Sequence, residues 1–390
     1  MLPALHLTTE VVLGGSSGSH RLPQEAVEVL ECVAAKDGDD KVSSTSAAPL
    51  VLGSSSSLTY HSLGYRQSGY IDDLAKRWAN PPELPLEEAS RDDGSPVTAV
   101  EREALPQLKA AILKRLGLDA LPTGFHAHHF TSFKLLCMLR ARGGDVPKAA
   151  DRAIECIEAV DLALKHAKAY EAAAEGLKDL RDVWFPQGVY GQDKRGAPVM
   201  YVRLGKLDAP GFVREVGADF HHDAEWYCYF LQWDSLLRES ERRGVWLQGH
   251  LIVIDLAGFS LTSSFAAKAV AKATLSRPTY PAGEHPMPEG ARKFLICSAP
   301  WWVGKLWAIA KLLLPARTTA KMSIFSDSHG AEFRRQLYAR VDPAQVPRWL
   351  VGGEGAALWP HGEGGEVPRG IGAAARGVPV PPAVGKCETI

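Results

Sequence analysis

The chain has 390 residues, of which 46% are hydrophobic and 23% are charged. This composition excludes a fully disordered or collagen-like protein, and the length leaves room for one large domain with extensions or for two modest domains. The 44 lysine and arginine residues nearly balance the 45 aspartate and glutamate residues, so the formal net charge is −1. A dedicated nucleic-acid binder is not expected, because neutralising phosphates normally requires a basic excess.

The cysteines and the N-terminal sequence indicate the expected compartment. Six cysteines are spread along the chain and none forms a CxxC pair, as expected for reduced thiols inside a cell. No basic segment followed by an apolar run marks a secretory signal, and no stretch reaches the roughly 18 apolar residues of a membrane-spanning helix. The presence of an organelle-targeting peptide stays an open question. We expect a cytoplasmic protein that contacts membranes only peripherally and transiently.

Residues 1–98 come first and are rich in Gly, Ser and Pro. We expect a mostly disordered extension with short helices over residues 22–35 and 71–78. Residues 14–18 read GGSSG, which fits the GxSxG motif of a hydrolase nucleophile. That motif needs a sheet before the serine and a helix directly after it. Low-complexity sequence surrounds this serine instead, so a hydrolase is the weaker alternative.

Residues 99–175 are expected to form a helical region. The spacing of apolar residues predicts helices over residues 101–116, 130–142 and 147–170, the last with Pro147 in its first turn and Asp145 as its cap. His126, His128 and His129 precede the second of these helices. No nearby cysteine or acidic residue completes a zinc site, so we expect these histidines in a solvated loop.

Residues 176–353 show a different pattern. Short apolar runs at residues 199–204, 251–256, 293–298 and 321–325 predict strands, with helical stretches between them. This alternation predicts an α/β fold with a mostly parallel or mixed sheet flanked by helices. Residues 354–390 are rich in Gly, Pro and Ala and are expected to form a disordered tail. Cys387 in this tail is a poor match to a prenylation motif, because its neighbours are not aliphatic.

Residues 301–314 predict a helix that is apolar on nearly every side. Such a helix is either buried all round or faces something apolar. At about 1.5 Å per residue it is only ~21 Å long, too short to cross a bilayer. Tryptophans with flanking lysines are typical of a helix at a membrane interface, so a core helix and an interfacial helix both stay open. The main apolar residues are Trp301, Trp302, Leu306, Trp307, Ile309 and Leu313.

Several segments, taken in order, carry a resemblance. They are LLCMLRARGGDVPKA (135–149), GQDKRGAPVMYVRLG (191–205), LIVIDLAGFS (251–260), PEGARKFLICSAPWW (288–302), TTAKMSIF (318–325) and VPRWLVGG (346–353). Together they resemble the CRAL-TRIO family of lipid-binding proteins, in its phosphatidylinositol-transfer-protein-like branch. Each segment is weak alone, but their order and spacing make the resemblance specific.

The resemblance implies a binding protein, not an enzyme, and no cofactor. The implied fold is a helical lead-in followed by a CRAL-TRIO-like domain around an apolar lipid cavity, with helix 301–314 as a mobile gate. The implied ligand is one phospholipid, with phosphatidylinositol as the first candidate, and the protein transfers it or presents it between membranes. About 30 methylenes at ~0.8 kcal/mol each make water exposure of a diacyl lipid cost about 25 kcal/mol, so a carrier must bury the tails.

The resemblance also assigns head-group residues. Arg142, Glu289, Thr318 and Lys321 match the polar set of the family's phosphatidylinositol binders. Arg and Lys suit a phosphodiester, Thr adds a hydroxyl, and a carboxylate accepts hydrogen bonds from inositol hydroxyls. Gly143 stands where these binders often have lysine, so one cation is missing. A plain structural ion pair between Glu289 and Lys321 stays an alternative.

The residues expected to line the cavity wall are Tyr201, His250, Ile252 and Ile254. Strand alternation puts the last three on one face, where two isoleucines make the wall too apolar for a choline-phosphate site. His250 can contact a phosphate, ligate a haem iron, or form a hydrogen bond where the strand begins. Other cargo therefore stays open: a sterol, a tocopherol-like or retinoid-like molecule, or haem. A scaffold that recruits partners through residues 1–98 stays open as well.

Overall fold

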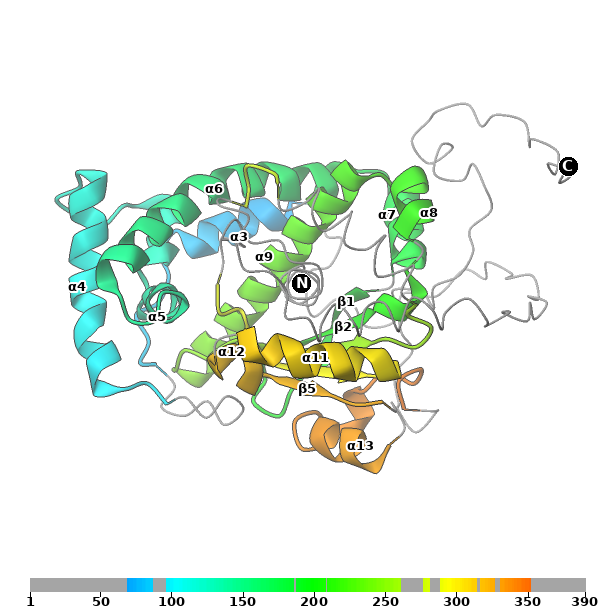
Figure 1. Cartoon of the computed structure of the whole chain (residues 1–390). Helices are drawn as coiled ribbons and strands as arrows, with labels where there is room; N and C mark the ends of the chain where they lie inside the picture. The colour runs from blue at the N-terminus through cyan, green and yellow to red at the C-terminus, as the bar shows by residue number, and fades with distance from the viewer. Residues whose placement is uncertain are drawn as a thin grey trace, which may run out of the picture.

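The computed structural model describes residues 69–86, 96–185, 187–207, 209–260, 276–280, 288–313, 316–326 and 330–351. The helix expected over residues 22–35, the GGSSG segment and the tail with Cys387 lie outside these residues. In the described part, a group of helices packs beside a five-stranded sheet that carries further helices (Figure 1).

Cap residues begin two of the long helices, and Asp145 is the one that the sequence predicted. Thr98 and Glu101 form a capping box that begins one long helix, and the Asp145 carboxylate accepts from the Lys148 backbone N–H to begin another. A short helix before them buries Ile71 and Leu74 completely, so it belongs to the core. The elements are α3 (Tyr70–Trp78), α4 (Ala99–Leu116), the 3-10 helix η2 (Gly124–Phe130), α5 (Ser132–Ala141), α6 (Val146–Ala172) and α7 (Glu175–Trp184).

The second half of the chain builds the sheet. Its strands lie in the order β1-β2-β3-β4-β5; β1 pairs antiparallel with β2, and the remaining pairs are parallel. The strands are β1 (Gln187–Gln192), β2 (Pro198–Arg203), β3 (His250–Asp255), β4 (Ala291–Cys297) and β5 (Met322–Ile324). The helices are η3 (Leu204–Lys206), α8 (Ala209–Glu215), α9 (Ala218–Arg243), α11 (Trp301–Leu313), α12 (Ala316–Ala320), α13 (Ala331–Tyr338) and η5 (Pro343–Gln345).

The two faces of the sheet have different partners. On one face, alternate residues of β2, β3 and β4, such as Met200, Ile252 and Phe294, pack against α7, α8 and α11. On the other face, their neighbours, such as Leu251 and Leu295, pack against α13 and the segment after it. Figure 1 shows α11 and α13 on opposite sides of β5. The face beneath α11 is called the α11 face below.

The fold class predicted from the sequence is confirmed: helices lead into a mixed α/β sheet flanked by helices. The four predicted strands correspond to β2, β3, β4 and β5, whereas β1 was not predicted. Its sequence, QGVYGQ, contains two glycines and two glutamines, so the β signal is weak, and antiparallel pairing at the sheet edge makes the strand.

The prediction of a solvated histidine loop is wrong. His128 and His129 lie in η2 and are only 4% and 6% exposed. The sequence showed no ligand partner for these histidines, so solvent was expected around them, but the Trp78 and Phe125 rings tilt against the His128 ring. Histidine has an apolar body, and tertiary packing decides whether that body is buried.

Among the described residues, none of the helices has both the length and the apolar character needed to cross a bilayer. In the same residues, no group of three or more His, Cys, Asp or Glu side chains is arranged to hold a metal ion.

Candidate functional site: the amino edge of the parallel strands

Three of the predicted site residues lie where the parallel strands begin. Glu289 lies two residues before β4, Lys321 lies directly before β5, and His250 is the first residue of β3. Parallel strands put all their amino ends at the same edge of the sheet. The sheet topology therefore gathers residues that are 71 positions apart in the chain, from His250 to Lys321.

Glu289 and Lys321 contact each other directly. Lys321 Nζ donates to Glu289 Oε2 at 2.5 Å, and the two side chains are 8% and 18% exposed. The Glu289 backbone has φ of +59°, a left-handed conformation that a glutamate rarely adopts. Such strain persists only where the surrounding structure holds it, and it is concentrated at functional sites.

Thr318 lies one helical turn before Lys321. Its carbonyl oxygen accepts the Lys321 backbone N–H at 3.2 Å, so α12 turns directly into β5. The Thr318 side chain is half-buried. Lys293 anchors the same turn, because its Nζ donates to the Ala320 carbonyl at 3.1 Å. The turn fixes the Lys321 backbone, and the hydrogen bond to Glu289 holds the ammonium.

The predicted arginine and its neighbour have different surroundings. Arg142 is half-buried at the end of α5, where its guanidinium donates to the Ala141 carbonyl oxygen at 3.2 Å. Arg140 is more deeply engaged: its side chain is 6% exposed, and it donates to both Glu101 carboxylate oxygens and to Gln248 Oε1. Gln248 lies two residues before β3, so Arg140 ties α4 and α5 to the amino edge. Sequence reasoning missed this link.

Helix α5 lies against this edge. The hydrogen bond from Arg140 on α5 to Gln248 Oε1, at 2.7 Å, joins the helical lead-in to the residues just before β3. Burial raises the pKa of the neighbouring Cys137 thiol to about 12, so this thiol is neutral.

His250 is buried and neutral. Its side chain is 3% exposed, and burial, together with the nearby Lys321 charge, lowers its pKa to about 3. A neutral imidazole adds no positive charge to the edge. His250 therefore differs from Lys321, whose ammonium pairs with Glu289.

The predicted cavity wall divides between the two faces of the sheet. Ile252 and Ile254 lie on the α11 face. Tyr201 does not: it pairs across the sheet with Val253 and lies in the cluster on the α13 face. Paired residues on neighbouring strands share a face, so grouping Tyr201 with Ile252 was wrong. Met200 and Val202 are the β2 residues on the α11 face.

The Trp-rich segment forms helix α11, which covers the apolar sheet face. Trp302 and Leu306 are buried in the cluster beneath it, Trp307 is half-buried, and Trp301 is 51% exposed. Lys305 Nζ lies 5.0 Å from the centre of the Trp301 ring. The side chains of Ile309 and Leu313 lie outside the described part of the chain.

These features combine an apolar surface with a charged end. The α11 face offers aliphatic and aromatic side chains, and its amino edge carries one ammonium and one carboxylate in contact. The class of protein that the fold defines is a mixed α/β protein whose sheet carries helices on both faces.

Comparison with known proteins agrees with this class. Residues 185–353 match the CRAL/TRIO domain. The chain therefore carries a CRAL/TRIO domain, and the resemblance found in the sequence is confirmed.

Curated relatives of the chain are distant. A CRAL-TRIO domain-containing protein of Caenorhabditis elegans is 24% identical over 302 residues, which cover 73% of this chain and 38% of that protein. The phosphatidylinositol/phosphatidylcholine transfer protein SFH9 of Arabidopsis thaliana is 24% identical over 327 residues, 80% of this chain and 50% of that protein. The chain thus spans half or less of the length of these two relatives. A solved structure, that of Sfh5, aligns with a TM-score of 0.38 at 13% identity, over 59% of this chain and 82% of that one.

Proposed function

We propose that this protein binds one phospholipid, with phosphatidylinositol as the first candidate, and transfers it or presents it between membranes. In this proposal, the acyl tails lie against the α11 face and the head group lies at the amino edge of the parallel strands. The match to the CRAL/TRIO domain supports lipid binding. The names of two relatives, the transfer proteins SFH9 and SFH11 of Arabidopsis thaliana, support a phospholipid as cargo.

The observation that carries the proposal is the ion pair between the buried Lys321 and the partly buried Glu289 beside an apolar sheet face. A phosphodiester is a strong partner for the Lys321 ammonium, and inositol hydroxyls are donors that suit the Glu289 carboxylate. When a head group carries both a phosphodiester and hydroxyls, Lys321 pairs with the phosphodiester and Glu289 accepts from the hydroxyls, in place of their contact with each other. Phosphatidylcholine lacks the hydroxyls, so it leaves the carboxylate without donors, which costs binding energy.

Helix α11 is the proposed gate. Moving it away from the sheet exposes Trp302, Val303 and Leu306, which are each 4–6% exposed in the structure. That step is unfavourable in water, by about 1.5–3 kcal/mol per large apolar side chain, and much less so against a bilayer. The exposed Trp301 and the adjacent Lys305 are the residue types that anchor a helix at a membrane surface.

Arg142 and Thr318 complete the proposed head-group set. Thr318 is one turn from Lys321 and half-buried, within the same α12–β5 turn. Arg142 ends α5, the helix that borders the edge. An arginine there adds a second cation for the phosphate, which offsets the missing lysine at position 143.

The test measures transfer of labelled phosphatidylinositol and phosphatidylcholine from donor to acceptor vesicles. The single variants are Lys321→Met and Glu289→Asn; asparagine is chosen because it tolerates positive φ better than other residues. We expect both variants to lower phosphatidylinositol transfer at least tenfold, about 1.4 kcal/mol, and Glu289→Asn to leave phosphatidylcholine transfer nearly unchanged.

The double variant Lys321→Met/Glu289→Asn removes both charges and avoids leaving one buried ion unpaired. It separates loss of a head-group partner from loss of folding, which circular dichroism checks. Glu332→Gln, in an exposed pair on α13, is the matched control and should transfer normally. No transfer of either lipid by the folded wild type, or full phosphatidylinositol transfer by the double variant, contradicts the proposal.

A further inference from the structure

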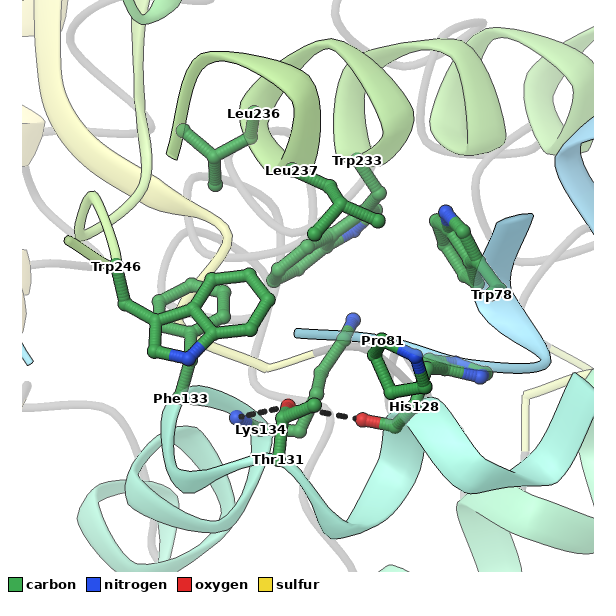
Figure 2. Close-up of a pocket in the computed structure, with 10 residues that line it drawn as sticks. All are labelled: Trp78, Pro81, His128, Thr131, Phe133, Lys134, Trp233, Leu236, Leu237 and Trp246. Carbon is green, nitrogen blue, oxygen red and sulfur yellow. Dashed lines mark hydrogen bonds between the residues drawn. The ribbon is translucent and has the colours of Figure 1, made fainter. Parts of the chain in front are cut away.

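A second site lies in the helical part of the molecule. A pocket opens between α3, η2, α5 and α9, with no lining residue in common with the amino edge described above. Figure 2 shows the Lys134 side chain extending from α5 into this pocket toward the Trp233 ring. The lining residues are Trp78, Pro81, His128, Thr131, Phe133, Lys134, Trp233, Leu236, Leu237 and Trp246.

Half of the residues that line the pocket have aromatic rings. Phe133 and Trp246 stack at 5.6 Å with an interplanar angle of 16°, and Trp233 tilts against Phe133 at 5.4 Å. Trp78 closes another side and lies 4.3 Å from the His128 ring, centre to centre. The empty space between these walls, counted together with the solvent at the open side of the pocket, is about 310 Å³.

Lys134 is the polar group in this aromatic setting. It is 6% exposed, and its Nζ has no hydrogen-bond or ion-pair partner among the residues that the structure describes. The Nζ lies 3.1 Å from the centre of the Trp233 ring and 5.7 Å from that of Trp78. A cation–π contact offsets only part of the cost of burying an ammonium, whose three N–H donors still need acceptors.

The titratable neighbours of Lys134 do not balance its charge. On η2, burial lowers the pKa values of His128 and His129 well below the usual range, so both rings are neutral. On α5 and α6, burial raises the pKa values of Cys137 and Cys156 to about 12, so both thiols are neutral. Burial lowers the pKa of Lys134 itself to about 7. Of these five groups, Lys134 alone changes charge near neutral pH.

From this geometry we infer that the pocket is a binding site for a small planar aromatic carboxylate, whose carboxylate pairs with Lys134 Nζ and whose ring packs on the tryptophan walls. An anion supplies the acceptor that the ammonium lacks, and the water-poor aromatic surroundings strengthen that ion pair. A planar ring matches the flat faces of Trp233 and Trp246. A structural role alone does not account for lysine at this position, because methionine fills similar space with no buried charge.

The test uses benzoate as the probe and benzamide as its neutral counterpart, with the whole chain in isothermal titration calorimetry. We expect benzoate to bind the wild type saturably. Benzamide should bind the wild type at least about tenfold more weakly, and so should benzoate bind Lys134→Met. Lys148→Met, on the exposed start of α6, is the matched control and should bind benzoate like the wild type. Because the ammonium is needed, affinity should fall about tenfold per pH unit above pH 7.

A stability measurement separates a ligand role from a structural one. If the site exists for a ligand, Lys134→Met should resist chemical denaturation better than the wild type, since it removes an unpaired buried cation. Lys134→Gln is the second variant if Lys134→Met fails to fold. Equal binding of benzamide and benzoate, unchanged benzoate binding in the variants, or variants less stable than the wild type would each overturn the inference.

Discussion

Replacing Arg140 by methionine tests how the helical lead-in is attached to the sheet. The Arg140 guanidinium donates to Glu101 Oε1 at 2.6 Å, to Glu101 Oε2 at 3.1 Å and to Gln248 Oε1 at 2.7 Å. Methionine keeps the stem of the side chain but removes the hydrogen bonds that Arg140 donates to a partly buried carboxylate and to an amide, while Thr98 still donates to that carboxylate. The Glu101 side chain is 19% exposed, so solvent screens some of the loss.

The expected loss lies between two limits. An exposed ion pair contributes less than about 1 kcal/mol, and breaking a fully buried one costs about 3–5 kcal/mol. With a 6% exposed guanidinium and a 19% exposed carboxylate, we expect Arg140→Met to lower the free energy of unfolding by about 2–3 kcal/mol at pH 7.

The pH dependence gives the sharper check. Burial by itself would raise the pKa of Glu101, but the hydrogen bonds from Arg140 and Thr98 lower it below its ordinary value of 4.5. A depressed carboxylate pKa contributes stability that is complete above the ordinary value and is lost as the pH falls through the folded-state pKa. The difference between wild type and Arg140→Met should therefore be largest at neutral pH and shrink below about pH 4.5.

The assay is urea-induced unfolding followed by circular dichroism at several pH values. Arg335→Met is the control, because Arg335 pairs with Glu332 on the exposed side of α13. A cycle with Glu101→Gln isolates the coupling between the two charges. The reasoning fails if Arg140→Met is no more destabilising than Arg335→Met, or if its effect is the same at pH 7 and at pH 4.

Two further predictions concern packing. Gly205→Ala should lower the free energy of unfolding by about 2 kcal/mol or more, because a Cβ there would lie 2.1 Å from the Ala257 carbonyl oxygen. Gly176→Ala in α7 places a Cβ where nothing lies within 4 Å, so it should be neutral or stabilising by about 0.5–1 kcal/mol. Equal denaturation midpoints for the two variants would contradict this. Leu74→Ala in α3, at 0% exposure, should lower the free energy of unfolding by about 2–5 kcal/mol. A change in midpoint too small to measure would mean that α3 is not part of the cooperative core.

The main helices and strands could be predicted because local pattern decides them. The Thr98 and Asp145 caps and the apolar runs of β3 and β4 act within a few residues, and the structure has these elements where they were expected. The edge strand β1 could not be predicted in the same way. Its residues have weak strand propensity, and its conformation depends on hydrogen bonds to β2, a partner on the far side of a turn.

The site was predicted only in part. The pairing of Glu289 with Lys321 was weighed from residue type, and the structure has it at 2.5 Å. The sequence analysis assigned a head-group role to Arg142 and did not name Arg140. Residues two apart on a helix point in nearly opposite directions, and sequence alone does not say which direction faces the sheet. Lys134 escaped notice for the same reason, since nothing local distinguishes a buried lysine from an exposed one.

The sequence by itself determined the CRAL/TRIO type, the alternation of helices and strands, and the apolar character of α11, because composition, periodicity and motif order are properties of the chain alone. Only the tertiary structure decided which groups meet. It assigned Tyr201 and Ile252 to opposite faces of the sheet, joined Arg140 to Gln248, and enclosed Lys134 among tryptophans. Such contacts join residues far apart in the chain, and burial then sets their charge states through desolvation, which no local pattern encodes.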